Sequence, residues 1–230
     1  MQKPIAYIKP NESVFIAGRT GSGKSFLAKT YLASYPAVIA LDTKEDLDWN
    51  EVPRDDLNII DTLADLPYAA SQPRCKVIYR PRLEEMKPEY WDEFFRYCYE
   101  RKNCIVWVDE VMSICPSAFK IPEYYKGILT RGRSRNTAVW SLSQRPSGIP
   151  IVIMSESKHF FVFDLNMAED RDRVAQVTGC PEIRMKPDQY ARDRLKIRGE
   201  HYFWYYYITW DGAQLGIMVR KRKGGKPSGY

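Results

Sequence analysis

The sequence predicts a three-layer α/β fold with a mostly parallel central sheet and a C-terminal β-hairpin. Apolar runs of four or five residues alternate along the chain with helical stretches, an order typical of strands and helices packed in layers. Several of these runs are continuous rather than alternating, which favours strands buried on both faces of a parallel sheet. The expected strands are 14–17, 37–41, 57–60, 76–79, 105–108, 138–142 and 160–163, and the expected helices are 25–34, 88–101, 122–130 and 168–178.

Two further runs, 201–208 and 214–219, flank the turn signal Asp211-Gly212 and predict the terminal hairpin. The first of them is almost entirely aromatic. Such residues are ordinary strand formers, and dense aromatics can also stack nucleic-acid bases. The strand interpretation is favoured, and base stacking stays open as the alternative.

The 230 residues, 44% of them hydrophobic, are enough for one large domain with a sizeable core. We expect a single domain over 1–219, with a core of about 12–180, a C-terminal extension over 181–219 and a basic tail over 220–230. Segment 43–74 is rich in Asp, Pro and Leu and is expected to be an irregular connector or a short insertion. No apolar run approaches the roughly 18 residues of a membrane span, and the amino end lacks an apolar signal core, so we expect a soluble, non-secreted protein without a membrane partner.

The net charge of +6 comes from the tail, because 30 basic and 29 acidic residues precede it. The tail could contact phosphates or only keep the chain soluble, and composition does not decide between these functions. The five cysteines form no CxxC pair and only two histidines could join them, which argues against a zinc site. We expect free, buried thiols in a reducing cytoplasm.

A phosphate-binding loop lies between the first strand and the first helix. The GxxxxGK[ST] pattern is matched by Gly18, Arg19, Thr20, Gly21, Ser22, Gly23, Lys24 and Ser25. Glycines in this pattern let backbone N–H groups converge on a β-phosphate, and the helix that follows directs its positive end there. Lys24 is expected to bridge the β- and γ-phosphates, and Ser25 to ligate Mg²⁺.

Two acids end the strand 105–108. Asp109 is expected to hold the magnesium through water, and Glu110 to polarise the attacking water. We expect this strand to lie beside the strand that carries the phosphate loop. A carboxylate directly after the magnesium acid favours hydrolysis over transfer to a second substrate.

A third strand, 138–142, ends before Gln144, whose polar side chain could sense the γ-phosphate. Arg131, Arg133 and Arg135 precede that strand, in a stretch from 124 to 155 without an acidic residue. These arginines are either a solvated basic loop or a source of a trans-acting finger for a neighbouring subunit.

In their order, the phosphate loop, the Asp109-Glu110 pair, the arginine run and Ser143-Gln144-Arg145-Pro146 resemble the FtsK/HerA superfamily of DNA-translocating ATPases. These four motifs span 18–146, and the resemblance continues through 155–163 and 169–174. The most specific part is 131–146, since many NTPases share the first two motifs.

The resemblance implies a RecA-like P-loop NTPase core that works with ATP and Mg²⁺ as a homo-oligomeric ring, a pentamer or a hexamer, around double-stranded DNA. It implies Gln144 as the polar sensor and Arg133 as the trans finger, with Arg131 and Arg135 as rivals. Viral members often have Ala-Arg-His before Asn, where this chain has Arg133-Ser134-Arg135-Asn136. The absence of an Asn-Lys-x-Asp motif also favours ATP over GTP.

The short chain looks like the genome-packaging ATPases of bacterial and archaeal viruses. The expected function is therefore ATP-driven DNA translocation in the host cytoplasm or on the virion, with a capsid portal or vertex protein as a further partner. Two alternatives stay open. One is a plasmid, conjugation or phage-assembly ATPase of the same superfamily, and the other is a nucleotide-regulated interaction module.

Overall fold

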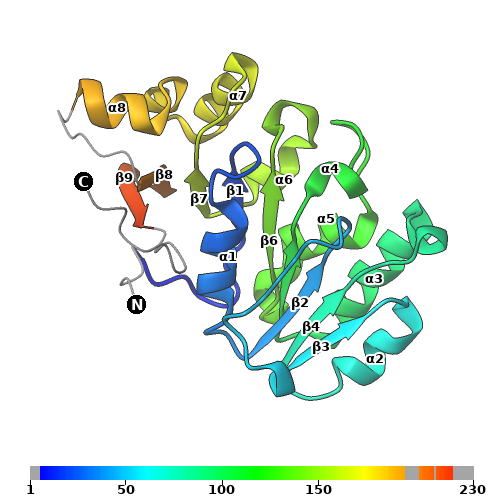
Figure 1. The fold of residues 1–230 in the computed structure, drawn as a ribbon. Helices are drawn as coiled ribbons and strands as arrows, with labels where there is room; N and C mark the ends of the chain where they lie inside the picture. The colour runs from blue at the N-terminus through cyan, green and yellow to red at the C-terminus, as the bar shows by residue number, and fades with distance from the viewer. Residues whose placement is uncertain (1–5, 195–201, 210, 220–230) are drawn as a thin grey trace.

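A computed structural model describes residues 6–194, 202–209 and 211–219, and these residues form one nine-stranded sheet (Figure 1). The strand order is β3-β4-β2-β5-β6-β1-β7-β8-β9. Strands β1 to β7 pair in parallel, and β8 and β9 continue the sheet as an antiparallel hairpin. The strands are β1 (Val14–Ala17), β2 (Ala37–Leu41), β3 (Leu57–Ile60), β4 (Cys75–Tyr79), β5 (Ile105–Val108), β6 (Ala138–Ser143), β7 (His159–Val162), β8 (Tyr202–Thr209) and β9 (Gly212–Val219).

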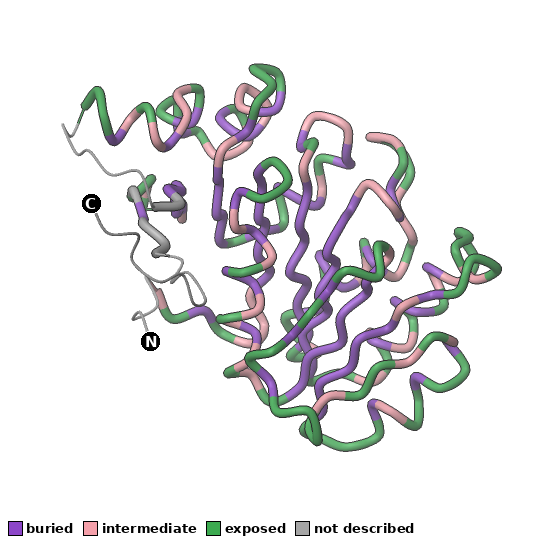
Figure 2. The backbone as a smooth tube through the Cα atoms, viewed as in Figure 1, coloured by how far each residue is buried: buried purple, intermediate pink, exposed green. Residues whose placement is uncertain are grey.

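Helices cover both faces of this sheet, which confirms the three-layer α/β prediction. The helices are α1 (Lys24–Leu32), α2 (Leu66–Ala69), α3 (Pro88–Arg101), α4 (Val111–Ile114), α5 (Glu123–Arg131), α6 (Ile151–Ser155), α7 (Ala168–Thr178) and α8 (Pro187–Asp193). Successive residues of β1 point to opposite faces: Val14 packs in one cluster with Leu27 of α1, and Phe15 packs in the other with Phe94 of α3. Figure 2 shows the result, with buried strands in the centre and exposed segments around them.

Segment 43–74 is more ordered than an irregular connector. It holds the edge strand β3 and the short helix α2, with single 3₁₀ turns at 54–56 and 63–65. The strand expected at 57–60 is confirmed.

The aromatic run of the hairpin belongs to the core. Trp204 to Ile208 are all buried, and the ring of Phe161 in β7 packs against those of Tyr205 and Tyr207 at 5.6 and 4.9 Å between centroids. The Tyr207 hydroxyl also hydrogen-bonds His159 Nδ1 at 2.7 Å. These contacts support the strand interpretation over a base-stacking surface.

All five cysteines are free and buried, as expected. The basic tail, 220–230, lies outside the described residues. Among the helices that the structure describes, none combines the length and the apolar character that a bilayer crossing requires.

Candidate active site

The phosphate loop connects β1 to α1 at the carboxyl edge of the parallel strands. Gly23 has the left-handed conformation (φ 104°) immediately before α1, a conformation that costs glycine little. Gly18 is packed so closely that a Cβ there would stand 2.5 Å from Ser22 Oγ and 2.7 Å from Phe163 Cβ. Both positions therefore need glycine, one for the turn and one for the close approach.

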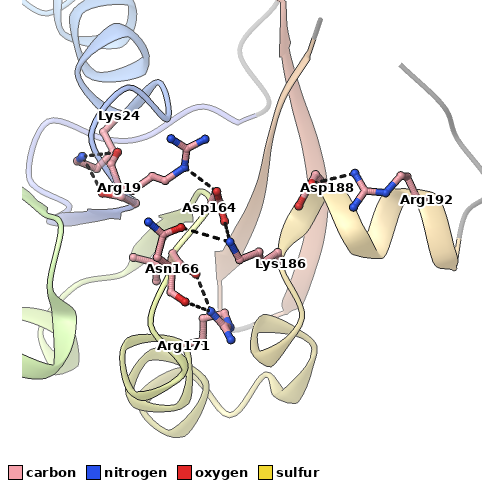
Figure 3. A network of polar contacts seen from close by, with 10 residues as sticks. Arg19, Lys24, Asp164, Asn166, Arg171, Lys186, Asp188 and Arg192 are labelled. Carbon is pink, nitrogen blue, oxygen red and sulfur yellow. Dashed lines mark hydrogen bonds and ion pairs between the residues drawn. The ribbon is translucent and has the colours of Figure 1, made fainter. Parts of the chain in front are cut away.

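Two polar groups of this loop fit a phosphate ligand. The buried Ser22 hydroxyl finds no hydrogen-bond partner among the described residues. The ammonium of Lys24 folds back to donate to the carbonyls of Gly18 and Arg19 at 2.7 and 3.2 Å (Figure 3). Burial lowers the pKa of Lys24 from 10.5 to about 8, against the opposing charges of Glu110 and Asp109. An anion in the loop would relieve this cost of burying a cation.

The predicted metal ligands lie together. Ser25, in the first turn of α1, donates to Asp109 Oδ1 at 3.1 Å. Burial raises the pKa of Asp109 from 3.8 to about 6; the Ser25 hydrogen bond lowers it, and the nearby carboxylates of Asp46 and Asp42 raise it further. Within the described part of the chain, no group of three or more His, Cys, Asp or Glu side chains could hold a metal. A magnesium ion here would take the Ser25 hydroxyl as a ligand, with Asp109 holding it through water as expected, and would complete its shell with oxygens from the nucleotide and further water.

One expectation about this edge is wrong. The strand before Asp109, β5, does not lie beside β1, because β6 is inserted between them. The two motifs still meet, since the carboxyl ends of neighbouring parallel strands share one edge and α1 starts directly above it. The inserted strand carries Gln144, which explains how three motifs gather at one point.

Glu110 is the centre of a chain of polar contacts. Gln144 Nε2 donates to Glu110 Oε2 at 3.0 Å, and Gln144 Oε1 accepts from Thr20 Oγ1 of the phosphate loop at 2.8 Å. Lys44 Nζ lies 2.9 Å from the same Glu110 oxygen. The structure thus brings Gln144, Glu110 and the phosphate loop together, and Lys44 is an addition that the sequence did not indicate.

A second unpredicted group fixes the end of β2 beside this site. Asp42 is fully buried, and its Oδ2 accepts from Arg80 Nε at 2.9 Å and from the Leu47 N–H at 3.0 Å. The β2–β5 register puts Leu41 opposite Val108, so the next residues, Asp42 and Asp109, lie side by side at the ends of these two neighbouring strands. The pair with Arg80 holds the chain segment that carries Lys44.

Arg19 of the phosphate loop points away from the loop's interior and pairs with Asp164, after β7, at 2.7 Å. Asp164 also pairs with Lys186, at the start of α8, at 2.9 Å, and Figure 3 shows it between the two cations. Burial opposes ionisation, but Lys186 and Arg19 hold the pKa of Asp164 below its ordinary value. This carboxylate ties the loop to the C-terminal extension.

A further buried carboxylate, that of Asp170, supports the turn after Gln144. Asp170 of α7 is 1% exposed and accepts from Arg145 Nε at 3.0 Å and from the N–H and hydroxyl of Ser147 at 3.0 and 2.7 Å. The carboxyl edge of the sheet is therefore held by side chains from four separate parts of the chain.

The three arginines lie at the opposite edge. Arg131 ends α5, and Arg133 and Arg135 belong to the 3₁₀ turn Gly132–Arg135, which precedes β6, whereas Gln144 follows β6. The six residues of β6 separate the two groups by about 20 Å. Arg135 stacks over the ring of Tyr99 at 3.8 Å, and Arg131 also contributes to lowering the pKa of Tyr99, after the larger effect of Arg135. Arg133 is exposed and has no ion pair among the described residues.

Comparisons with known proteins agree with this architecture. No protein-family model matches the sequence, and neither does any curated protein. The genome packaging NTPase B204 of Sulfolobus turreted icosahedral virus 2, in complex with AMPPCP, matches with a TM-score of 0.64 at 13% identity, over 91% of this chain and 98% of that one. ATPases 2 and 3 of EssC from Geobacillus thermodenitrificans match with a TM-score of 0.54 at 15% identity, over 91% and 40% of the two chains. The pCW3 conjugation coupling protein TcpA matches with a TM-score of 0.52 at 12% identity, over 90% and 60%.

The fold is thus that of a P-loop ATPase. The match with the genome packaging NTPase extends over nearly the whole of both chains. The resemblance that the motifs predict is confirmed at the level of the fold.

Proposed function

We propose that this protein is an ATP-driven double-stranded DNA translocase, and specifically the motor ATPase that packages a viral genome. The observation that carries the proposal is the convergence of Lys24, Ser25, Asp109, Glu110 and Gln144 at one edge of the sheet. Three segments of the chain meet there, namely the start of α1, the end of β5 and the end of β6, and their meeting supports phosphoryl transfer to water as the reaction.

Each side chain then has a defined task. Lys24 would exchange its loop carbonyls for phosphate oxygens, and Ser25 with Asp109 would hold Mg²⁺, which would supply charge stabilisation at the phosphates. Glu110 orients and polarises the attacking water. Gln144 connects Glu110 to Thr20, so it can report a change in the loop to the catalytic acid.

A ring is proposed because the arginines lie about 20 Å from the loop of their own chain. A neighbouring copy could present its amino edge to this site. Arg133 is the favoured trans finger because it is the free one of the three, while Arg135 is stacked on Tyr99. The number of subunits, five or six, is left open.

The DNA and the portal or vertex protein are proposed partners, and the host cytoplasm or the virion is the proposed location. DNA contacts of such a motor are expected to be independent of sequence and to weaken as salt rises.

The experiment that tests the proposal is steady-state ATP hydrolysis with and without long double-stranded DNA. We expect DNA to stimulate turnover, and Glu110→Gln to lower kcat by about 10²- to 10⁴-fold while ATP binding persists. Turnover that ignores both DNA and Glu110→Gln would contradict the motor and favour a nucleotide-regulated interaction module.

A plasmid or conjugation ATPase is the second candidate, because the fold also matches a conjugation coupling protein. The packaging proposal is preferred because this chain covers 98% of the packaging NTPase but 60% of the coupling protein. Stimulation by a capsid portal protein would separate the two functions.

A further inference from the structure

Lys102 follows α3, lines the groove together with the three arginines, and has a backbone conformation that lysine rarely adopts. Its φ of 60° and ψ of 176° fall in a region that is used almost solely by glycine. This conformation raises the free energy of the folded state for a residue with a Cβ, and glycine would avoid that cost. The chain therefore has a lysine where the backbone alone would favour glycine.

Contacts from two loops hold this backbone in place. Arg101 Nη1 donates to the Lys102 carbonyl at 3.1 Å, and the Asn103 N–H donates to the Arg135 carbonyl at 3.1 Å. Asn136 Nδ2 also donates to Asn103 Oδ1 at 3.1 Å. The turn that carries Lys102 is thus joined to the 3₁₀ turn that carries the arginines, so the positions of these cations depend on one another.

The charge of Lys102 is not neutralised within the groove. The side chain is exposed, the lining residues include no acid, and Lys102 forms no ion pair with another described residue. Four cations share this groove, namely Lys102, Arg131, Arg133 and Arg135. Because like charges at short range raise each other's free energy, the groove is suited to a polyanion from outside the chain.

The phosphate chain of a nucleotide is the polyanion that fits this groove best. It concentrates several negative charges at one point, as the groove concentrates positive ones, whereas a DNA strand carries single charges spaced along its length. Lys102 precedes β5 and Asp109 follows it, so about 20 Å separate the lysine from the candidate magnesium site of its own chain. The nucleotide must therefore belong to another copy.

We propose that Lys102 is a second trans-acting cation, which contacts the phosphates of the nucleotide held by a neighbouring copy, beside Arg133. This inference rests on the proposed function, because it needs a ring in which the amino edge of one copy faces the carboxyl edge of the next. The joined turns fix the stem of the lysine relative to Arg133, so both charges reach the nucleotide together. Lys102 is then a catalytic residue of the neighbour's site.

A strained turn can also be only a tight connection between α3 and β5. In that case the side chain at position 102 has no task, and glycine stabilises the protein at no loss of activity. Lys102→Gly separates the two roles, because this one substitution relieves the backbone and removes the charge.

The first measurement compares Lys102→Gly, Lys102→Arg and Lys126→Met. Lys126 is the control because it is another exposed lysine, on α5, that does not line the groove. We expect Lys102→Gly to raise the thermal midpoint by about 2–4 °C while kcat of the assembled protein falls about 10- to 100-fold, the rate equivalent of one charge-assisted hydrogen bond. Lys102→Arg should stay within about fivefold of the wild type, and Lys126→Met should match it. A stabilised Lys102→Gly with full turnover would overturn the inference.

Mixed rings test whether the lysine acts in trans. Lys102→Gly subunits have an intact Glu110, and Glu110→Gln subunits have an intact Lys102, so some interfaces of a mixed ring join both intact residues. We expect the mixture to exceed the summed activity of the two variants measured alone. No gain on mixing would mean that Lys102 does not serve the neighbour's site.

A third measurement does not depend on turnover. In sedimentation velocity, a non-hydrolysable ATP analogue with Mg²⁺ should promote self-association of the wild type, since a ligand that bridges two copies stabilises their complex. Lys102→Gly should weaken this association about tenfold and leave association without the analogue unchanged. Association that ignores the analogue would contradict the inference. So would a Lys102→Gly variant that loses only DNA binding, because the groove would then serve the DNA backbone.

The failure of the inference and that of the proposed function are distinguishable. If analogue-driven association depends on Lys102 in a protein that does not hydrolyse ATP, the inference stands and the proposed function is wrong. If ATP is hydrolysed through Glu110 and neither kcat nor association responds to Lys102→Gly, the proposed function stands and the inference is wrong.

Discussion

The two edges of the parallel sheet differ in how far the chain satisfies its own charges. At the carboxyl edge, Glu110, Asp164 and Asp170 are each paired with a cation of the same chain. At the amino edge, the groove lined by Tyr99, Lys102 and the three arginines contains no acid. At the carboxyl edge these three acids are neutralised within the chain, whereas the basic side chains of the groove at the amino edge have no acid beside them. A second copy with nucleotide bound would supply an anion.

The largest expected effect comes from removing the exposed charge of Arg133 at the amino edge. Arg133→Ala should lower the turnover of the assembled protein by about 10³-fold, as removal of an arginine finger does. The decisive measurement mixes Arg133→Ala with Glu110→Gln subunits. If the finger acts in trans, some interfaces in mixed rings join an intact Arg133 to an intact Glu110, and activity returns. Mixtures as inactive as each variant alone would contradict the two-copy site.

The next prediction removes one of the neutralised acids at the carboxyl edge. Asp170→Ala leaves Ser147 and its N–H without an acceptor, so we expect a loss of about 2–3 kcal/mol in the free energy of unfolding. Chemical denaturation measures this change. Asp172→Ala is the control on the same helix, because its pair with Arg184 is about half-exposed on both sides and should contribute below about 1 kcal/mol. Equal losses in the two variants would show that burial of Asp170 has no special importance.

A third prediction concerns Asp109, a buried acid at the carboxyl edge that forms no ion pair with a basic side chain among the described residues. Asp109→Asn removes a buried charge, so we expect the nucleotide-free protein to become more stable by about 1–2 kcal/mol while Mg²⁺-dependent hydrolysis is lost. The folded pKa, about 6, lies above the ordinary 3.8, so the folded state binds more protons between these values. Stability of the wild type therefore falls as pH rises from about 4 to 6. Thermal unfolding across this range, in the absence of metal, should show a smaller slope for Asp109→Asn.

The smallest expected effect sharpens the distinction among the arginines. Tyr99→Leu removes the ring on which Arg135 stacks, an interaction of about 0.5–1 kcal/mol at an exposed site. If the stacked arginine only shapes the groove, ring turnover should drop no more than about fivefold. A loss as large as that of Arg133→Ala would identify Arg135 as the finger instead.

The motifs predicted most of the candidate site because each of them is a short run of residues with a fixed spacing. The phosphate loop, the acid pair and Gln144 each follow a strand, and parallel strands bring their ends together. Lys44, Asp42 and Asp170 could not be predicted in this way. Their partners are far away in the chain, and nothing in the spacing around them differs from that of solvated charges. A sequence pattern shows where a strand ends but not which strands become neighbours, which is also why the insertion of β6 between β5 and β1 was missed.

The hairpin and the longer helices α1, α3, α5 and α7 were predicted from the sequence, whereas the shorter helices α2, α4, α6 and α8 were not, and the segment 43–74 was predicted less well. Its residues alternate little, and its strand β3 is only partly buried at the sheet edge. A strand that is buried on only one face contains few apolar residues in a row, so the sequence indicates it weakly. The contact of Asp42 with Arg80, which fixes the start of this segment, appears only after β2 and β4 have paired.

The position of β1 in the sheet also determines when this strand can pair during synthesis of the chain. Val14 pairs with Trp140 on one side and with His159 on the other, so this apolar strand waits for partners made well over a hundred residues later. On a ribosome this interval is roughly ten seconds, during which β1 needs shelter from other chains. The candidate nucleotide site is also completed late, because Asp109 and Gln144 follow their contacts in the first turn of α1 and in the loop by 84 and 124 residues. ATP can therefore act as a folding ligand only after Gln144 and the strands around it are in place, so nucleotide should raise the refolding yield late and dependence on chaperones should arise early.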